Sequence, residues 1–141
     1  MESIAKRVKF GKRLHAAFPF CGIRIKQLLD YMVEMDQEEA IDLIQFIDIE
    51  KDKNGADPLT PSDVTEFRSH LGSILYITGC IRSFEAYSVS HLSAYTTDGQ
   101  VTHLRQVNAV IKQLKATKEF RLRYVKLDGP LLVYSFGDSN F

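Results

Sequence analysis

The stretch "TPSDVTEFRSHLGSILYITG", residues 60–79, decides the fold, because it carries the clearest helix signals in the chain. Thr60 can cap the free N–H groups of a first turn, and Pro61 follows at the first helical position, where its missing N–H costs nothing. Asp63 then lies near the positive end of the helix dipole. Apolar residues recur at helical spacing and predict one buried stripe, formed by Val64, Phe67, Leu71, Ile74, Leu75 and Thr78.

The predicted helix contains two glycines, and the sequence after it indicates a corner. Gly72 in mid-helix costs about 1 kcal/mol relative to alanine, so we expect another backbone to pack closely there. Gly79 predicts the helix end, and Ser83 can cap a second helix. Arg82 lies at the corner, where we expect it to brace the chain by hydrogen bonds. The predicted apolar positions of the second helix are Phe84, Tyr87, Leu92 and Tyr95.

The flanking segments complete an α+β prediction. Alternating apolar residues in 7–35 predict a small N-terminal antiparallel sheet, and Asp36 with Glu39 predicts a capped short helix that follows it. The apolar positions predicted for that helix are Ala40, Leu43, Ile44 and Ile47. A further amphipathic helix begins at Thr102, with Leu104, Val107, Ile111 and Leu114 on its apolar side. Three to four amphipathic helices are thus expected.

The chain ends in a predicted β-hairpin around a turn at Asp128-Gly129-Pro130. The polar stretch "EKDKNGADP" is the only clear break in the sequence. We therefore divide the chain into three segments: a sheet-containing segment at 1–50, a helical segment at 51–118 and a hairpin segment at 119–141.

Composition narrows the function classes. With 141 residues, 45% of them apolar, the chain is long enough for one domain with a modest core. Eighteen basic and eighteen acidic side chains cancel, which argues against a nucleic-acid-binding domain with a global excess of positive charge. Cys21 and Cys80 form no paired motif, so we predict buried thiols in a reducing compartment, cytoplasmic or nuclear. No apolar run is long enough to span a membrane.

Catalytic motifs are missing from the sequence. Two-metal chemistry on phosphodiesters needs converging carboxylates, and no Asp-Asp pair occurs. Glu38 and Glu39 are neighbours on a predicted helix and point about 100° apart, as expected of a solvated first turn. The four histidines show no zinc-ligand spacing, and no nucleophile or phosphate-loop motif is present. Residues of this chain are therefore not expected to catalyse a reaction.

Charge is distributed unevenly along the chain. Residues 34–66 hold eleven acids against two lysines, whereas residues 102–126 hold seven bases against one glutamate. The basic side chains that could follow a phosphate backbone are Arg105, Lys112 and Lys115 on the predicted helix, and Arg121 and Arg123 on the strand after it. A solvated helix face is the alternative interpretation of the helical residues.

Several blocks, taken in order, resemble the reverse transcriptase region of copia-type LTR retrotransposon Pol polyproteins, from thumb and connection to the start of ribonuclease H. They are "FPFCGIRI", "MDQEEAIDLIQFIDI", "LTPSDVTEFRSHLGSILYI", "THLRQVNAVIKQLKAT" and "LLVYSFGDSNF". The third block is the most specific, because Phe67, Arg68, Gly72, Leu75 and Tyr76 all fall in step with the family pattern. The resemblance covers nearly the whole length.

The chain also departs from that pattern. At the corner the family usually reads T-R-P-D, and here Arg82 is kept while Ser83 and Phe84 replace the proline and the aspartate. The family's polymerase Asp-Asp hairpin would precede residue 1. By resemblance, Asp138 corresponds to the first metal-binding carboxylate of ribonuclease H, but its partner carboxylates are absent, and one carboxylate cannot hold a metal pair.

The resemblance implies a scaffold for primer and template that is non-catalytic alone. Its expected partners are an RNA–DNA hybrid or DNA and the remainder of the Pol polyprotein, with no membrane partner and no cofactor of its own. Magnesium would belong to the parental enzyme. Arg68, Gly72 and Arg82 have structural roles in this interpretation. The alternative is a small helical protein-interaction module, derived from a decayed transposable element, that uses an exposed apolar face.

Overall fold

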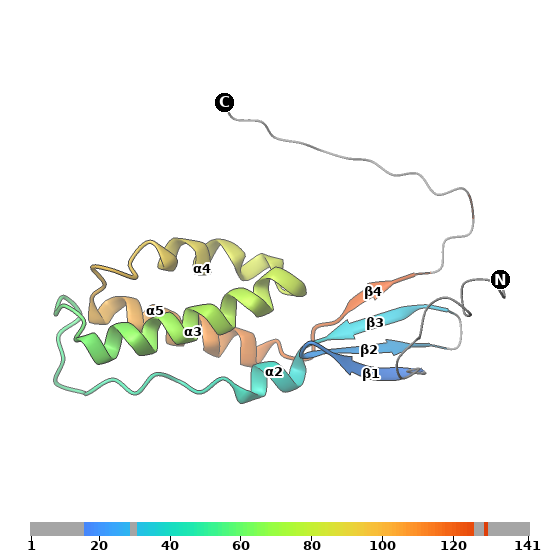
Figure 1. The fold of residues 1–141 in the computed structure, drawn as a ribbon, viewed down its shortest axis with the longest axis horizontal. Helices are drawn as coiled ribbons and strands as arrows, with labels where there is room; N and C mark the ends of the chain where they lie inside the picture. The colour runs from blue at the N-terminus through green and yellow to red at the C-terminus, as the bar shows by residue number, and fades with distance from the viewer. Residues whose placement is uncertain (1–15, 29–30, 126–128, 130–141) are drawn as a thin grey trace, which may run out of the picture.

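The computed structural model describes residues 16–28, 31–125 and 129, and these form a four-stranded sheet at one end of a group of helices (Figure 1). The elements are β1 (Ala17–Phe20), β2 (Ile23–Gln27), β3 (Val33–Asp36), α2 (Glu38–Leu43), α3 (Pro61–Cys80), the 3-10 turn η1 (Ser83–Glu85), α4 (Ala86–Ser93), α5 (Val101–Ala116) and β4 (Leu122–Tyr124). The predicted α+β class is confirmed.

The sheet is antiparallel and has the strand order β1-β2-β3-β4. Its N-terminal part confirms the prediction from alternating residues. β4 joins from the other end of the chain, and Leu122 pairs with Met35 of β3. The first strand of the predicted C-terminal hairpin is therefore an edge strand of the N-terminal sheet, while the turn partner lies outside the described residues.

The core lies among α3, α4 and α5, which run alongside one another in Figure 1. Its buried apolar residues include Phe67, Leu71 and Ile74 of α3, Val89 and Leu92 of α4, and Leu104, Val107, Ile111 and Leu114 of α5. All four apolar positions predicted for the helix after Thr102 are thus buried. This helix and its apolar side are confirmed.

The predicted start of α3 is also confirmed. The Thr60 hydroxyl accepts a hydrogen bond from the Asp63 backbone N–H at 3.2 Å, and the Asp63 carboxylate accepts one from the Thr60 N–H at 3.0 Å. Lys53 pairs with the same carboxylate at 3.2 Å. The Thr60 hydroxyl and Lys53 lower the pKa of Asp63, against a partial burial that raises it. A charged Asp63 therefore stabilises the first turn.

The helix predicted to run through Ile47 ends earlier, at Leu43. Its cap residue is Gln37 rather than Asp36, although Asp36 Oδ1 still accepts a bond from the Glu38 N–H at 3.3 Å. The chain from Ile44 is extended, and the Asn108 side chain bonds both the N–H and the carbonyl of Ile47, at 2.8 and 2.9 Å. Because a side chain of α5 satisfies this backbone, the helix does not need to continue.

The corner after α3 differs from the prediction in three ways. α3 continues through Gly79 to Cys80, and Ser83 begins the turn η1 without acting as a side-chain cap. Phe84 and Tyr87 are 52% and 81% exposed, so the stripe predicted for this helix is wrong at both positions. Leu92 of the predicted stripe is buried and Tyr95 packs against the core, as expected, while Val89 is a further buried residue of α4.

Candidate functional site

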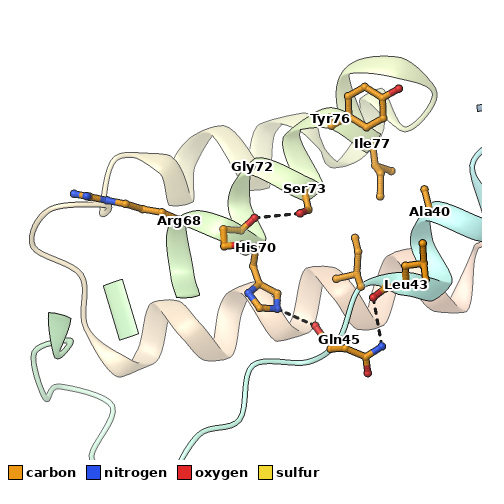
Figure 2. A pocket seen from close by; sticks show the side chains of 11 residues that line it. Ala40, Leu43, Gln45, Arg68, His70, Gly72, Ser73, Tyr76 and Ile77 are labelled. Carbon is orange, nitrogen blue, oxygen red and sulfur yellow. Dashed lines mark hydrogen bonds between the residues drawn. The ribbon is translucent and has the colours of Figure 1, made fainter. Parts of the chain in front are cut away.

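A groove of about 810 Å³ lies between the outward side of α3 and the chain formed by α2 and the residues after it (Figure 2). Leu43, which is 79% exposed, forms one wall. Gly72 and Tyr76 of α3 line the other side. Tyr76 and its neighbour Leu75 remain 43% and 44% exposed, which contradicts the prediction that Leu75 is buried.

Gly72 has a different role from the one predicted. A Cβ atom built at this position would meet no atom of the described residues within 4 Å, so the expected close helix crossing is wrong. The core side of α3 carries Phe67, Leu71 and Ile74, whereas Gly72 lies on the opposite, exposed side and lines the groove. The glycine therefore widens the groove instead of admitting a neighbouring helix of this chain.

His70 connects the two walls of the groove (Figure 2). Its Nδ1 lies 2.9 Å from the Glu66 carbonyl oxygen on α3, and its Nε2 lies 3.1 Å from the Gln45 carbonyl oxygen. The second contact ties the extended segment to α3. The polar contact between His70 and Gln45 thus joins the two sides of the groove.

Arg68 also lines the groove, and its guanidinium extends away from His70 in Figure 2. Its Nε and one terminal nitrogen donate hydrogen bonds to the Thr96 carbonyl oxygen at 3.1 and 2.8 Å. This fork joins α3 to the segment after α4, in line with the structural role expected of Arg68. A guanidinium held in this way is a poor candidate for a template contact.

Arg82 is the largest fully buried side chain, with 0% exposure. One terminal nitrogen donates to the Thr117 hydroxyl at 3.2 Å, and the guanidinium carbon lies 5.0 Å from the centre of the Phe120 ring and 5.9 Å from that of Phe84. Burial lowers the pKa of Arg82, while Asp36 and Glu85 oppose the shift. Arg82 therefore connects the corner to the residues at the end of α5.

Two basic residues predicted to bind nucleic acid contact backbone carbonyls instead of facing solvent freely. Arg105 donates to the Lys53 carbonyl oxygen at 2.8 Å. Lys115 lies 3.3 Å from the carbonyl oxygens of both Ile41 and Asp42. Both side chains thus hold the N-terminal half of the chain against α5, and each keeps N–H donors for a further acceptor.

Arg123 of β4 and Arg121, which directly precedes this strand, share one acidic partner. Arg123 Nε lies 2.8 Å from a Glu34 oxygen, and Arg121 lies 3.7 Å from the other oxygen of the same carboxylate. The Glu34 side chain is only 9% exposed. Lys112, in contrast, is exposed on α5 and has no hydrogen bond or ion pair with the described residues.

The sequence also held a signal for the groove that motif searching missed. No charged side chain occurs between Arg68 and Arg82 except the ionisable His70, although Gly72 and Tyr76 lie on the exposed side of this interval. An exposed helix surface is normally charged. The outward side of α3 in this interval therefore differs from an ordinary charged helix surface.

The remaining site predictions concern metals and membranes. Asp138 lies outside the described residues. Within the described ranges, no cluster of three or more histidine, cysteine or acidic side chains is arranged to hold a metal ion. None of the helices in the described part has both the length and the apolar character needed to cross a membrane. Comparison of the chain with protein-family models, curated proteins and solved structures finds no match.

Proposed function

We propose that this chain is a scaffold segment of a copia-type reverse transcriptase, non-catalytic alone, that grips an RNA–DNA hybrid while the remainder of the Pol polyprotein carries out synthesis. The supporting observation is that the sequence block with the most specific resemblance forms α3 and has two different faces. Phe67 anchors the core, while Gly72 and Tyr76 border the groove. One helix thus offers an inward face for packing and an outward face for another part of the polyprotein.

The grip would come from α5. Neither α4 nor α5 contains an aspartate or glutamate, so phosphate groups would meet no repulsive carboxylate on these helices. Lys112 is the most available cation, and Arg105 keeps unused donors beside it. Arg121 and Arg123 would have to exchange Glu34 for phosphate. The expected grip is therefore weak, with a small number of phosphate contacts.

Replacing Lys112 with glutamate should weaken binding of a fluorescently labelled RNA–DNA hybrid, measured by anisotropy at low salt. For about two phosphate contacts, a fourfold rise in salt should lower the affinity of the unmodified chain roughly tenfold, because releasing each counterion into a more concentrated salt solution gains less entropy. The variant should show a shallower salt dependence. Lys51→Glu, which makes the same charge change at an exposed residue outside α5, serves as the control.

Absence of binding at both salt concentrations would reject the grip. Equal losses from the Lys112 and Lys51 variants would show that net charge, and not the α5 surface, determines affinity.

A second candidate function is that of an interaction module, and the groove favours it. Leu43, 79% exposed, and Tyr76 of α3, 43% exposed, both line it. Such apolar exposure marks a contact surface. In this case the partner is a second copy of the chain, seated groove to groove.

The Leu43→Asp variant should then remain monomeric at concentrations where the unmodified chain dimerises, as followed by sedimentation velocity. A charged side chain in the contact would have to lose its hydration. Phe20→Asp, at an exposed apolar position on β1, is the matched control. A chain that is monomeric at all concentrations and binds the hybrid contradicts this second function.

A further inference from the structure

Both cysteines are exposed, contrary to the sequence prediction of buried thiols. Cys21 lies in the turn between β1 and β2, at an edge of the sheet, and Cys80 is the last residue of α3. They are separated in sequence by β2, β3, α2 and α3. A single side chain, Tyr76, connects their surroundings.

Tyr76 lies on α3 near Cys80 and contacts the turn that holds Cys21. Its hydroxyl donates a hydrogen bond to the Cys21 carbonyl oxygen, and a Cβ atom added to Gly22 would lie 3.7 Å from its ring. Cys80 lies four residues after Tyr76 on α3, one turn further along the same side. Partial burial raises the pKa of Tyr76, and the neighbouring thiols of Cys80 and Cys21 raise it further. Both thiols therefore lie near one phenol.

The turn holds Cys21 in an unusual conformation. Cys21 and Gly22 have φ angles of 48° and 72°, as in a type I′ hairpin turn, and Phe20 pairs with Ile23 on either side. Asparagine, aspartate or glycine is the usual residue at the first of these positions, because a left-handed conformation is sterically unfavourable for most other side chains. A cysteine here has a conformational cost and is presented to solvent.

We propose that Cys21 and Cys80 are an oxidation site, at which a peroxide converts the two thiols into an intramolecular disulfide between the β1–β2 turn and the end of α3. One thiolate attacks hydrogen peroxide, forms a sulfenic acid and releases hydroxide, which takes up a proton to become water. The second thiolate displaces the sulfenic hydroxyl as a second water. The cysteines lose two electrons and two protons, and the peroxide is reduced to two waters.

The disulfide would act on the groove. Tyr76 lines the groove and contacts the turn, so a bond from Cys21 to Cys80 would fasten the sheet to α3 next to the groove wall. The closed loop would contain β2, β3, α2 and the whole of α3. Such a link removes conformational freedom from the unfolded chain and raises the melting temperature. The site is independent of nucleic-acid binding.

The test treats the reduced full-length chain with a small excess of hydrogen peroxide. We expect a mass lower by two hydrogen atoms, loss of both titratable thiols, a Cys21–Cys80 cross-linked peptide and a chain that remains monomeric on a non-reducing gel. The melting temperature should rise by about 5–15 °C and return after treatment with dithiothreitol. The same reaction in concentrated urea should be at least tenfold slower, because unfolding separates the thiols.

Three variants sharpen the result. Cys80→Ser leaves one thiol and should give no intramolecular product. Cys80→Ser combined with Ser90→Cys keeps two thiols but moves one to α4, and it should lose the fast reaction. Tyr76→Phe removes the hydroxyl contact to Cys21 and should slow the reaction several-fold. Persistence of both thiols, cross-links only between chains, or equal rates in the native and unfolded chains would each overturn the proposal.

Discussion

The Phe67→Ala variant is expected to lose about 3–5 kcal/mol of unfolding free energy, the usual cost of removing a buried phenylalanine ring. Phe67 is 0% exposed and belongs to the core cluster shared by α3, α4 and α5. The loss combines the transfer free energy of the ring with the cavity left behind. Since a domain of this size is stable by about 5–15 kcal/mol, the variant should be close to unfolding at room temperature.

Urea denaturation followed by circular dichroism measures this difference, and Leu75→Ala is the control. Leu75 lies on the same helix, and the periodicity of the sequence assigns it to the same stripe as Phe67. The structure leaves it 44% exposed, so its truncation should cost less than about 1 kcal/mol. If the two variants lost similar amounts of unfolding free energy, Leu75 would be buried as the sequence predicts, and the packing described above would be contradicted.

The contrast between Phe67 and Leu75 shows what local pattern can predict. The start of α3 is determined by Thr60, Pro61 and Asp63, which interact within one turn, and a sequence signal was sufficient to place it. The buried side of α5 was predicted for a similar reason, because its apolar residues recur with one period. Local interactions of this kind are visible without knowledge of the rest of the chain.

Long-range contacts explain the errors. α2 ends at Leu43 because the Asn108 side chain, from α5, takes up the backbone groups of Ile47. Gly72 could not be assigned to a groove before the other side of α3 was known to hold the core. The contact between Tyr76 and the Cys21 carbonyl oxygen could not be expected without the hairpin formed by β1 and β2.

The candidate nucleic-acid surface shows the same limit. The sequence predicts that Lys112 and Lys115 lie on one helix, and both are part of α5. The partners of the basic residues, however, come from other segments. Glu34, which pairs with Arg121 and Arg123, precedes them by almost the whole helical part of the chain. A charge pattern along one element predicts where cations lie, whereas their availability depends on what the fold places opposite them.

Two substitutions of Arg82 should change the unfolding free energy by amounts that differ in sign or in size. Two of its guanidinium nitrogens, Nε and one terminal nitrogen, are buried without a hydrogen-bond partner among the described residues. A buried charge with incomplete hydrogen bonding is costly, and an apolar side chain of similar volume often replaces it with neutral or improved stability. Arg82→Met should therefore leave the unfolding free energy unchanged or raise it.

Arg82→Ala should instead lower the unfolding free energy by about 2–4 kcal/mol, because it also removes the aliphatic stem and leaves a cavity between Phe84 and Phe120. Urea unfolding of both variants separates packing from charge. If methionine were as damaging as alanine, the bond to Thr117 and the contacts with the two rings would outweigh the desolvation of the guanidinium. Thr117→Val, which removes only the hydroxyl that accepts from Arg82, would then reproduce part of the loss. If only the alanine variant is destabilised, the side-chain volume of Arg82 stabilises the corner, and burial of its charge lowers the stability of the fold.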